Sequence, residues 1–114
     1  MTKREISQCS PYNPPNHFNM AAIRLHGKEE SGAEKFWMGM SHFLPGGGAS
    51  FDASPTQKIY FVLEGEVVVT DAAGERIVLK RWDSICIGAD EGRSVLNETN
   101  LPATMLVIIN YPQT

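Results

Sequence analysis

The sequence predicts an all-β protein, built as a small antiparallel barrel or sandwich. About eight short runs rich in β-branched and aromatic residues follow one another, with Gly, Asp and Asn between them. No window has a sustained helical period, and no internal repeat is visible. Many short strands at near-regular spacing are typical of a barrel or sandwich, so this fold class follows from the pattern alone.

The chain is expected to begin with an extended arm, residues 1–17, followed by one barrel domain, residues 18–114. Prolines in the arm remove backbone donors and fix φ, which disfavours a helix. Residues 19–26 then predict a first strand. A second strand is predicted at residues 35–44, with a polar loop before it, and its apolar side chains lie on both faces.

Residues 45–69 are the most informative stretch. A Pro-Gly-Gly-Gly segment at its start is expected to end the second strand. Two apolar runs, residues 58–63 and 66–69, then flank Glu64 and Gly65. Because glycine takes a positive φ without steric cost, these runs are expected to fold back on each other as a tight hairpin.

The rest of the chain predicts shorter strands separated by turns. Ala72, Ala73 and Gly74 are expected to form a turn after the strand that ends at Asp71. The strands expected after this turn are residues 76–79, 83–87, 92–98 and 103–110.

The spacing in the central stretch resembles the first motif of the cupin superfamily, small β-barrels that usually hold one divalent metal ion. The family pattern places Gly, His, His, Glu and Gly where this chain has Gly46, Asp52, Ser54, Lys58 and Gly65. Both glycines match, and none of the three metal ligands does. A looser second motif, running from Trp82 through Gly88, Asp90 and Arg93 to Asn97, matches at Asn97 alone. The resemblance implies a double-stranded β-helix, or jelly-roll barrel of RmlC-like type, over residues 36–110, with degenerate metal-binding motifs.

If these positions point inward as they do in the family, Asp52, Ser54, Lys58 and Tyr60 face the cavity, with Arg93 and Asn97 opposite. Lysine and arginine carry positive charge and only donate hydrogen bonds, so neither can ligate a divalent cation. No metal and no other cofactor is therefore expected. Two cations against one carboxylate instead favour a small carboxylated or phosphorylated ligand. The alternative is an internal ion pair between Asp52 and Lys58 or Arg93 that closes the pocket.

Candidate roles follow from this interpretation. Lys58 is the candidate general base, because burial near another cation lowers the pKa of an amine. The candidate acids are Asp52, His42 and Tyr60. The candidate ligand-binding residues are Arg93, Ser54, Asn97 and Met40. A non-standard metal site remains open if His42, His26 and Asp52 converge.

Three functions compete. The first is a metal-independent barrel that binds a small anionic metabolite, with isomerase, lyase or decarboxylase-type acid/base chemistry or a lysine–carbonyl adduct. The second is a non-catalytic binding or sensor module. The third is a metal-dependent, dioxygenase-like enzyme, against which the residues at positions 52, 54, 58 and 93 count directly.

The composition limits the binding partners and the cellular location that can be expected for the chain. A formal net charge of −3 argues against a nucleic-acid partner. No window approaches the ~20 apolar residues of a membrane-spanning helix, and no signal peptide is recognised, so a cytoplasmic location is expected. Two cysteines make no disulfide framework. The arm and the doubly apolar strand at residues 35–44 supply surface to bury, which predicts a homodimer.

Overall fold

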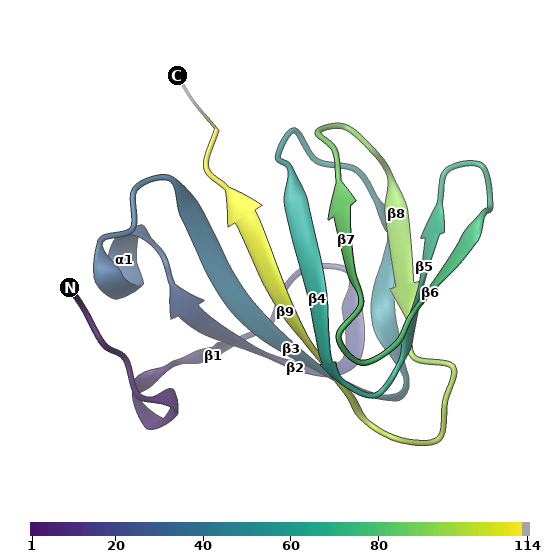
Figure 1. Ribbon diagram of the computed structural model, residues 1–114, viewed down its shortest axis with the longest axis horizontal. Helices are drawn as coiled ribbons and strands as arrows, with labels where there is room; N and C mark the ends of the chain where they lie inside the picture. The colour runs from purple at the N-terminus through teal and green to yellow at the C-terminus, as the bar shows by residue number, and fades with distance from the viewer. Residues whose placement is uncertain (113–114) are drawn as a thin grey trace.

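The computed structural model describes residues 1–112 as an antiparallel β-barrel that is nearly closed, which confirms the predicted fold class (Figure 1). The strands pair in the order β6-β5-β8-β3-β9-β4-β7, while β2 lies along β3 and β1 lies along β2. The bounds are β1 Pro11–Tyr12, β2 His17–His26, β3 Phe36–Asp52, β4 Lys58–Glu64, β5 Val67–Asp71, β6 Arg76–Leu79, β7 Ser84–Ile87, β8 Arg93–Leu96 and β9 Ala103–Asn110.

Strand β3 does not end at the glycines, so the predicted turn at Pro45 is wrong. The strand continues to Asp52 and changes partners on the way. Its first half pairs with β9 and its second half with β8. A Cβ on Gly47 would lie 2.1 Å from the carbonyl oxygen of Asn19, and one on Gly48 would lie 2.0 Å from that of Val95. The glycines therefore let neighbouring backbones approach closely where one strand bends from one side of the barrel to the other.

The hairpin predicted at Glu64 and Gly65 is also wrong. Strand β4 pairs with β7 and β9, whereas β5 pairs with β6 and β8. Gly65 does take a positive φ, 76°, as expected for a sharp change of direction. The turn carries the chain from one side of the barrel to the other, because both strands already have partners on their own side.

The turn predicted at residues 72–74 is confirmed, since β5 and β6 pair as neighbours on either side of it. The loop expected between the first two long strands contains one helical turn, α1 (Lys28–Ser31), which ends at Gly32 with a φ of 76°. In the arm, a short 3-10 helix (Ile6–Gln8) precedes β1, and β1 pairs with β2 through Tyr12 opposite Ala22. The arm is thus joined to the barrel by backbone hydrogen bonds.

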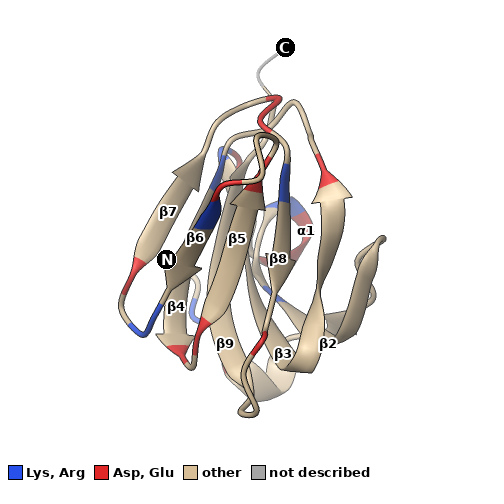
Figure 2. Ribbon diagram, turned by 90° about the vertical axis from the view of Figure 1, so that its right-hand side faces the viewer, with Lys and Arg blue, Asp and Glu red and all other residues tan. Residues whose placement is uncertain are grey.

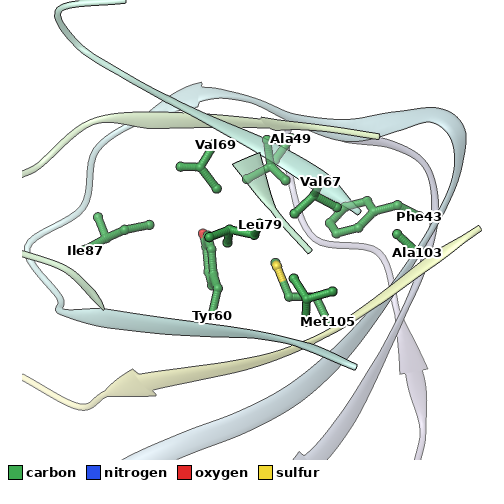
Figure 3. Packing of buried hydrophobic residues seen from close by; sticks show 11 residues of the cluster. Phe43, Ala49, Tyr60, Val67, Val69, Leu79, Ile87, Ala103 and Met105 are labelled. Atoms are coloured by element: carbon green, nitrogen blue, oxygen red, sulfur yellow. The ribbon is translucent and has the colours of Figure 1, made fainter. Parts of the chain in front are cut away.

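Side chains from both sides of the barrel meet in its interior. Tyr60 and Met105 come from β4 and β9, and they point toward Val69 and Ala49 from β5 and β3 (Figure 3). Val62, Val67 and Ala103 are completely buried in the same cluster. Five members of this cluster also line a cavity inside the barrel: Phe43, Ala49, Tyr60, Val95 and Met105.

Charged residues lie mainly toward strand ends and in loops, and no single sign dominates one side of the barrel (Figure 2). Within residues 1–112, no helix is long and apolar enough to cross a membrane.

Candidate ligand pocket

A cavity of about 340 Å³ occupies the open end of the barrel, a size typical of small-molecule sites. Its apolar wall comes mainly from β8, β9 and both halves of β3. The polar and aromatic residues that line it are Tyr12, His17, Arg24, Trp37, Ser41, Phe43, Lys58, Tyr60 and Arg93.

Strand register explains how these residues come together. Trp37, Ile109 and Lys58 lie opposite one another across β3, β9 and β4 and form one row of the inner face. One step deeper, Arg24, Gly39, Val107 and Tyr60 form the next row, which begins on β2. Because side chains alternate between the two faces of a strand, each of these rows presents its side chains to the cavity.

Lys58 is a buried cation without a carboxylate partner in residues 1–112. Its side chain lines the cavity, and the residue is 7% exposed. Nζ donates a hydrogen bond to Oγ of Ser54 at 2.6 Å, so two of its three donors are left for a ligand. Burial, reinforced by the charge of Arg93 and partly opposed by that of Asp52, lowers the pKa of Lys58 below its ordinary value of 10.5.

Arg93 faces Lys58 from the other side of the barrel and is 8% exposed. Its Nε donates to the hydroxyl of Tyr60 at 2.8 Å, and Nη1 donates to the carbonyl of Ser50 at 3.4 Å. These contacts fix the plane of the guanidinium and leave Nη2 without a hydrogen bond to the described residues. Burial raises the pKa of Tyr60, an effect that the charge of Arg93 reduces, so the phenol stays neutral near neutral pH.

Asp52 does not form the internal ion pair considered above. It pairs with Arg93 across the strands through its backbone, but its side chain is exposed and accepts a hydrogen bond from the amide of Ala53. Among residues 1–112, the salt bridges join Lys3 to Glu5 and Arg76 to Glu98, far from the cavity lining. The pocket is therefore not closed by a carboxylate of its own.

The cavity lining does not include five of the predicted site residues: Asp52, Ser54, His42, Met40 and Asn97. His42 and Met40 alternate with the inward Ser41 on β3 and face the opposite way, and Nδ1 of His42 lies 3.0 Å from Oγ1 of Thr104. Asn97 is fully buried, but its amide donates to the carbonyls of Phe43 and Leu101 and accepts from Thr99. Its hydrogen bonds thus hold the loop after β8 against β3.

The lining residues that were not predicted include Tyr12, His17, Arg24 and Trp37. Alternation along residues 19–26 contains a signal for Arg24, because Ala22 and Arg24 lie opposite Ser41 and Gly39 of the inner face. The arm residues carry no such signal, since their position depends on pairing with β2. Burial raises the pKa of Tyr12 to about 12 against the opposing charge of Arg24, and burial also lowers the pKa of His17.

The non-standard metal site considered from sequence is not formed. His26 hydrogen-bonds through Nδ1 to Ser31, while His42 contacts Thr104. In the part of the chain that the structure describes, no three His, Cys, Asp or Glu side chains lie close enough to hold a metal ion.

The chain is similar in sequence and in structure to several known proteins. The family described as Cupin domain matches residues 39–109. The Beta-D-galactosidase Rv1717 of Mycobacterium tuberculosis is 38% identical over 112 residues, which cover 98% of this chain and 96% of that protein. Similar solved structures include the polyketide cyclase RemF from Streptomyces resistomycificus, with a TM-score of 0.85 and 16% identity over 96% of this chain and 79% of that one. A predicted oxalate decarboxylase from Thermotoga maritima has a TM-score of 0.81 and 21% identity over 97% of this chain and 100% of that one.

Proposed function

Because this chain belongs to the cupin domain family, we propose that it is a small cupin that binds an anionic compound inside its barrel without a metal ion. One observation carries the proposal: Lys58 and Arg93 are buried in a cavity whose lining includes no Asp or Glu. Leaving two cations in an apolar interior costs free energy unless something compensates their charge. A carboxylate or phosphate is the compensating group that suits an ammonium beside a guanidinium.

The donor set does not fit the divalent cation that cupins usually hold. Lys58 and Arg93 supply hydrogen-bond donors and positive charge, and neither can act as a ligand. Ser54, the residue nearest to Lys58 in this set, uses its hydroxyl to accept from Nζ. Metal-dependent dioxygenase chemistry therefore has no support in this set of residues.

A carbohydrate acid is the ligand class we favour. The 38% identical relative is named a β-D-galactosidase, which supports a sugar as the organic part of the ligand. The cations then favour a sugar that bears a carboxylate or phosphate. D-Galacturonate, D-galactonate and D-galactose are suitable probes, since they separate the acidic group from the ring. Isothermal titration that detects binding of neither acid would overturn the proposal.

Galactoside hydrolysis is the second candidate function, because the same relative is similar over nearly its whole length. Most glycoside hydrolases use two carboxyl groups that flank the scissile bond. Among residues 1–112, no carboxyl group lines this cavity, and Asp52 is exposed. Release of nitrophenol from 4-nitrophenyl β-D-galactopyranoside, lost on Lys58→Met and on Arg93→Met, would assign hydrolysis to this cavity.

Catalysis, where it occurs, would depend on Lys58. In its neutral form the amine could accept a proton from a carbon next to the bound acid group, and the lowered pKa of Lys58 increases the fraction of neutral amine at a given pH. Isomerisation, lyase chemistry and decarboxylation are all compatible with such a base. A binding module without turnover is the alternative. Incubation of D-galacturonate with the protein in ²H₂O distinguishes them, since deuterium incorporation requires proton transfer.

Binding of D-galacturonate is expected to weaken at alkaline pH. The charged amine holds the anion, so affinity stays constant below the lowered pKa of Lys58 and falls as pH rises through it. The bound anion raises the pKa of Lys58 in the complex, and the affinity stops falling once the pH exceeds that higher value. Lys58→Met is expected to bind about tenfold more weakly and to lose this alkaline decline, in line with one charge-assisted hydrogen bond. Titration calorimetry from pH 7 to pH 10 measures the affinity and its pH dependence in both proteins. An alkaline decline that persists in Lys58→Met would contradict the role of Lys58 in holding the anion.

A second copy of the chain is the proposed partner. Two adjacent register rows across β3, β9 and β4 carry uncharged outward side chains: Met38, Ile108 and Ile59 in one row, and Met40, Leu106 and Phe61 in the next. Such an uncharged band on a chain with 23 acidic and basic residues (10 + 13) suits a symmetric contact. Light scattering is expected to give a dimer mass, and Ile59→Asp a monomer mass. A monomer mass for the unaltered protein at micromolar concentration would refute the dimer.

A further inference from the structure

We infer that Tyr12, Trp37 and Arg24 form a second recognition element in the cavity wall, which binds the ring of a cyclic sugar acid. The inference rests on the proposed function, since the acid group of the same ligand would lie on Lys58 and Arg93. It adds a substrate class: a pyranose that carries an acidic group, as opposed to an open-chain acid.

The position of Trp37 is the first observation. Trp37 and Gly39 both belong to the inner face of β3. A Cβ on Gly39 would lie 2.2 Å from the indole Cη2 and within 2.9 Å of its Cζ2 and Cζ3. The six-membered part of the indole thus occupies the space that a side chain at residue 39 would fill. Glycine at this position brings the indole against the backbone and makes it a wall of the cavity.

Tyr12 and Arg24 extend this wall. The rings of Tyr12 and Trp37 meet edge to face, with centroids 5.7 Å apart and planes at 90°. The guanidinium of Arg24 lies 4.5 Å from the centroid of the Tyr12 ring. These contacts hold the arm's tyrosine beside the cavity, and all three side chains line it. Two aromatic rings and a cation are therefore fixed next to one another in the lining of the cavity.

The chemistry of this wall suits a sugar ring. Aromatic faces are electron-rich, and they attract the weakly positive C–H groups on the apolar side of a pyranose. Arg24 adds donors for ring hydroxyls. The wall also lies at the level of Lys58, because Trp37, Ile109 and Lys58 form one row across three adjacent strands. Two strand spacings, about 10 Å, separate the first and last backbones of that row. One six-membered ring with one acidic group can bridge the side chains that enter from both ends.

The test compares a cyclic and an open-chain acid of the same carbon number. The unaltered protein is expected to bind D-galacturonate about tenfold more tightly than D-galactonate, as one ring contact on an aromatic wall allows. Trp37→Ala is expected to remove this preference and leave the affinity for D-galactonate within about twofold. Trp37→Phe, which keeps an aromatic ring, is expected to retain part of the preference.

Trp82 supplies the matched control. It is the other tryptophan of the chain, is 59% exposed, and has Arg81 stacked 4.5 Å from its ring, but it does not line the cavity. Trp82→Phe is expected to bind both acids normally. In this variant Trp37 is the sole tryptophan, so D-galacturonate is expected to change its fluorescence and D-galactonate to leave it nearly unchanged.

The outcomes separate the two proposals. The proposed aromatic wall is refuted if Trp37→Ala keeps the preference for D-galacturonate, or if it loses affinity for both acids equally. Either result leaves the proposed anion site unaffected. If D-galactose binds as tightly as D-galacturonate and depends on Trp37, the wall stands and the anion site fails. If neither acid binds, the proposed function fails and this inference falls with it.

Discussion

Replacing Arg93 with methionine is expected to weaken binding of D-galacturonate at least about 30-fold. Arg93 is almost fully buried, and its Nε and Nη1 are held by Tyr60 and Ser50. Truncating one partner of a buried charged contact costs about 2–5 kcal/mol, and 1.4 kcal/mol corresponds to a factor of ten in affinity. The guanidinium is already oriented before the ligand arrives, so little of this free energy is spent on ordering it. Titration calorimetry at pH 7 measures the loss.

Two further variants make the result specific. Arg76→Met removes an arginine whose side chain is 57% exposed and bound to Glu98, and it is expected to leave affinity unchanged. Arg93→Lys keeps the charge but loses the planar donor pair, so an intermediate affinity is expected. Tight binding by Arg93→Met in a variant that keeps its melting temperature would show that the anion is held elsewhere.

Gly48→Ala is expected to destabilise the fold by about 3 kcal/mol or more, with a melting temperature lower by more than about 10 °C. Gly48 lies between Phe18 of β2 and Leu96 of β8. An added Cβ would lie 2.0 Å from the carbonyl oxygen of Val95, and backbone on both sides prevents relief by a side-chain rotation. The two halves of the barrel would have to separate where β3 joins them. Thermal unfolding followed by circular dichroism measures the change.

Gly74 is the control for this substitution. It has a φ of 83° and no atom within 4 Å of an added Cβ, so Gly74→Ala is expected to cost about 1 kcal/mol from backbone strain alone. Close approach, rather than loss of a flexible residue, is the cause proposed for Gly48. Equal destabilisation in the two variants would contradict it.

The fold class could be predicted from sequence because it depends on local patterns. Short β-branched runs and the turn at residues 72–74 report structure within a few residues of themselves. The pairing of strands does not follow from such patterns. Glycine at position 65 does take a positive φ, but whether its flanking strands pair depends on β7, β8 and β9, which come later in the chain. The glycines after Pro45 were likewise interpreted as a turn, because close backbone approach leaves no signal in a local window.

In the pocket, too, some residues could be predicted from the sequence, and others are placed by long-range strand pairing. Lys58, Tyr60 and Arg93 were predicted to face the cavity from the family spacing, and the structure brings these three together there. Met40 and His42 lie one step out of phase with Ser41, so they face away, and only the register with β9 establishes that. Tyr12 reaches the cavity because the arm pairs with β2, a long-range contact that its prolines and polar neighbours do not indicate.

The central position of β9 has a consequence for how the protein is made. This strand lies between β3 and β4, and its Asn110 pairs with Phe36 at the beginning of β3. A nascent chain on the ribosome therefore lacks the strand that joins these two until residues near 110 emerge from the exit tunnel. Until then the edges of β3 and β4 stay open to a chaperone or to a neighbouring nascent chain. Barrel closure is consequently expected to follow synthesis of this region instead of accompanying it.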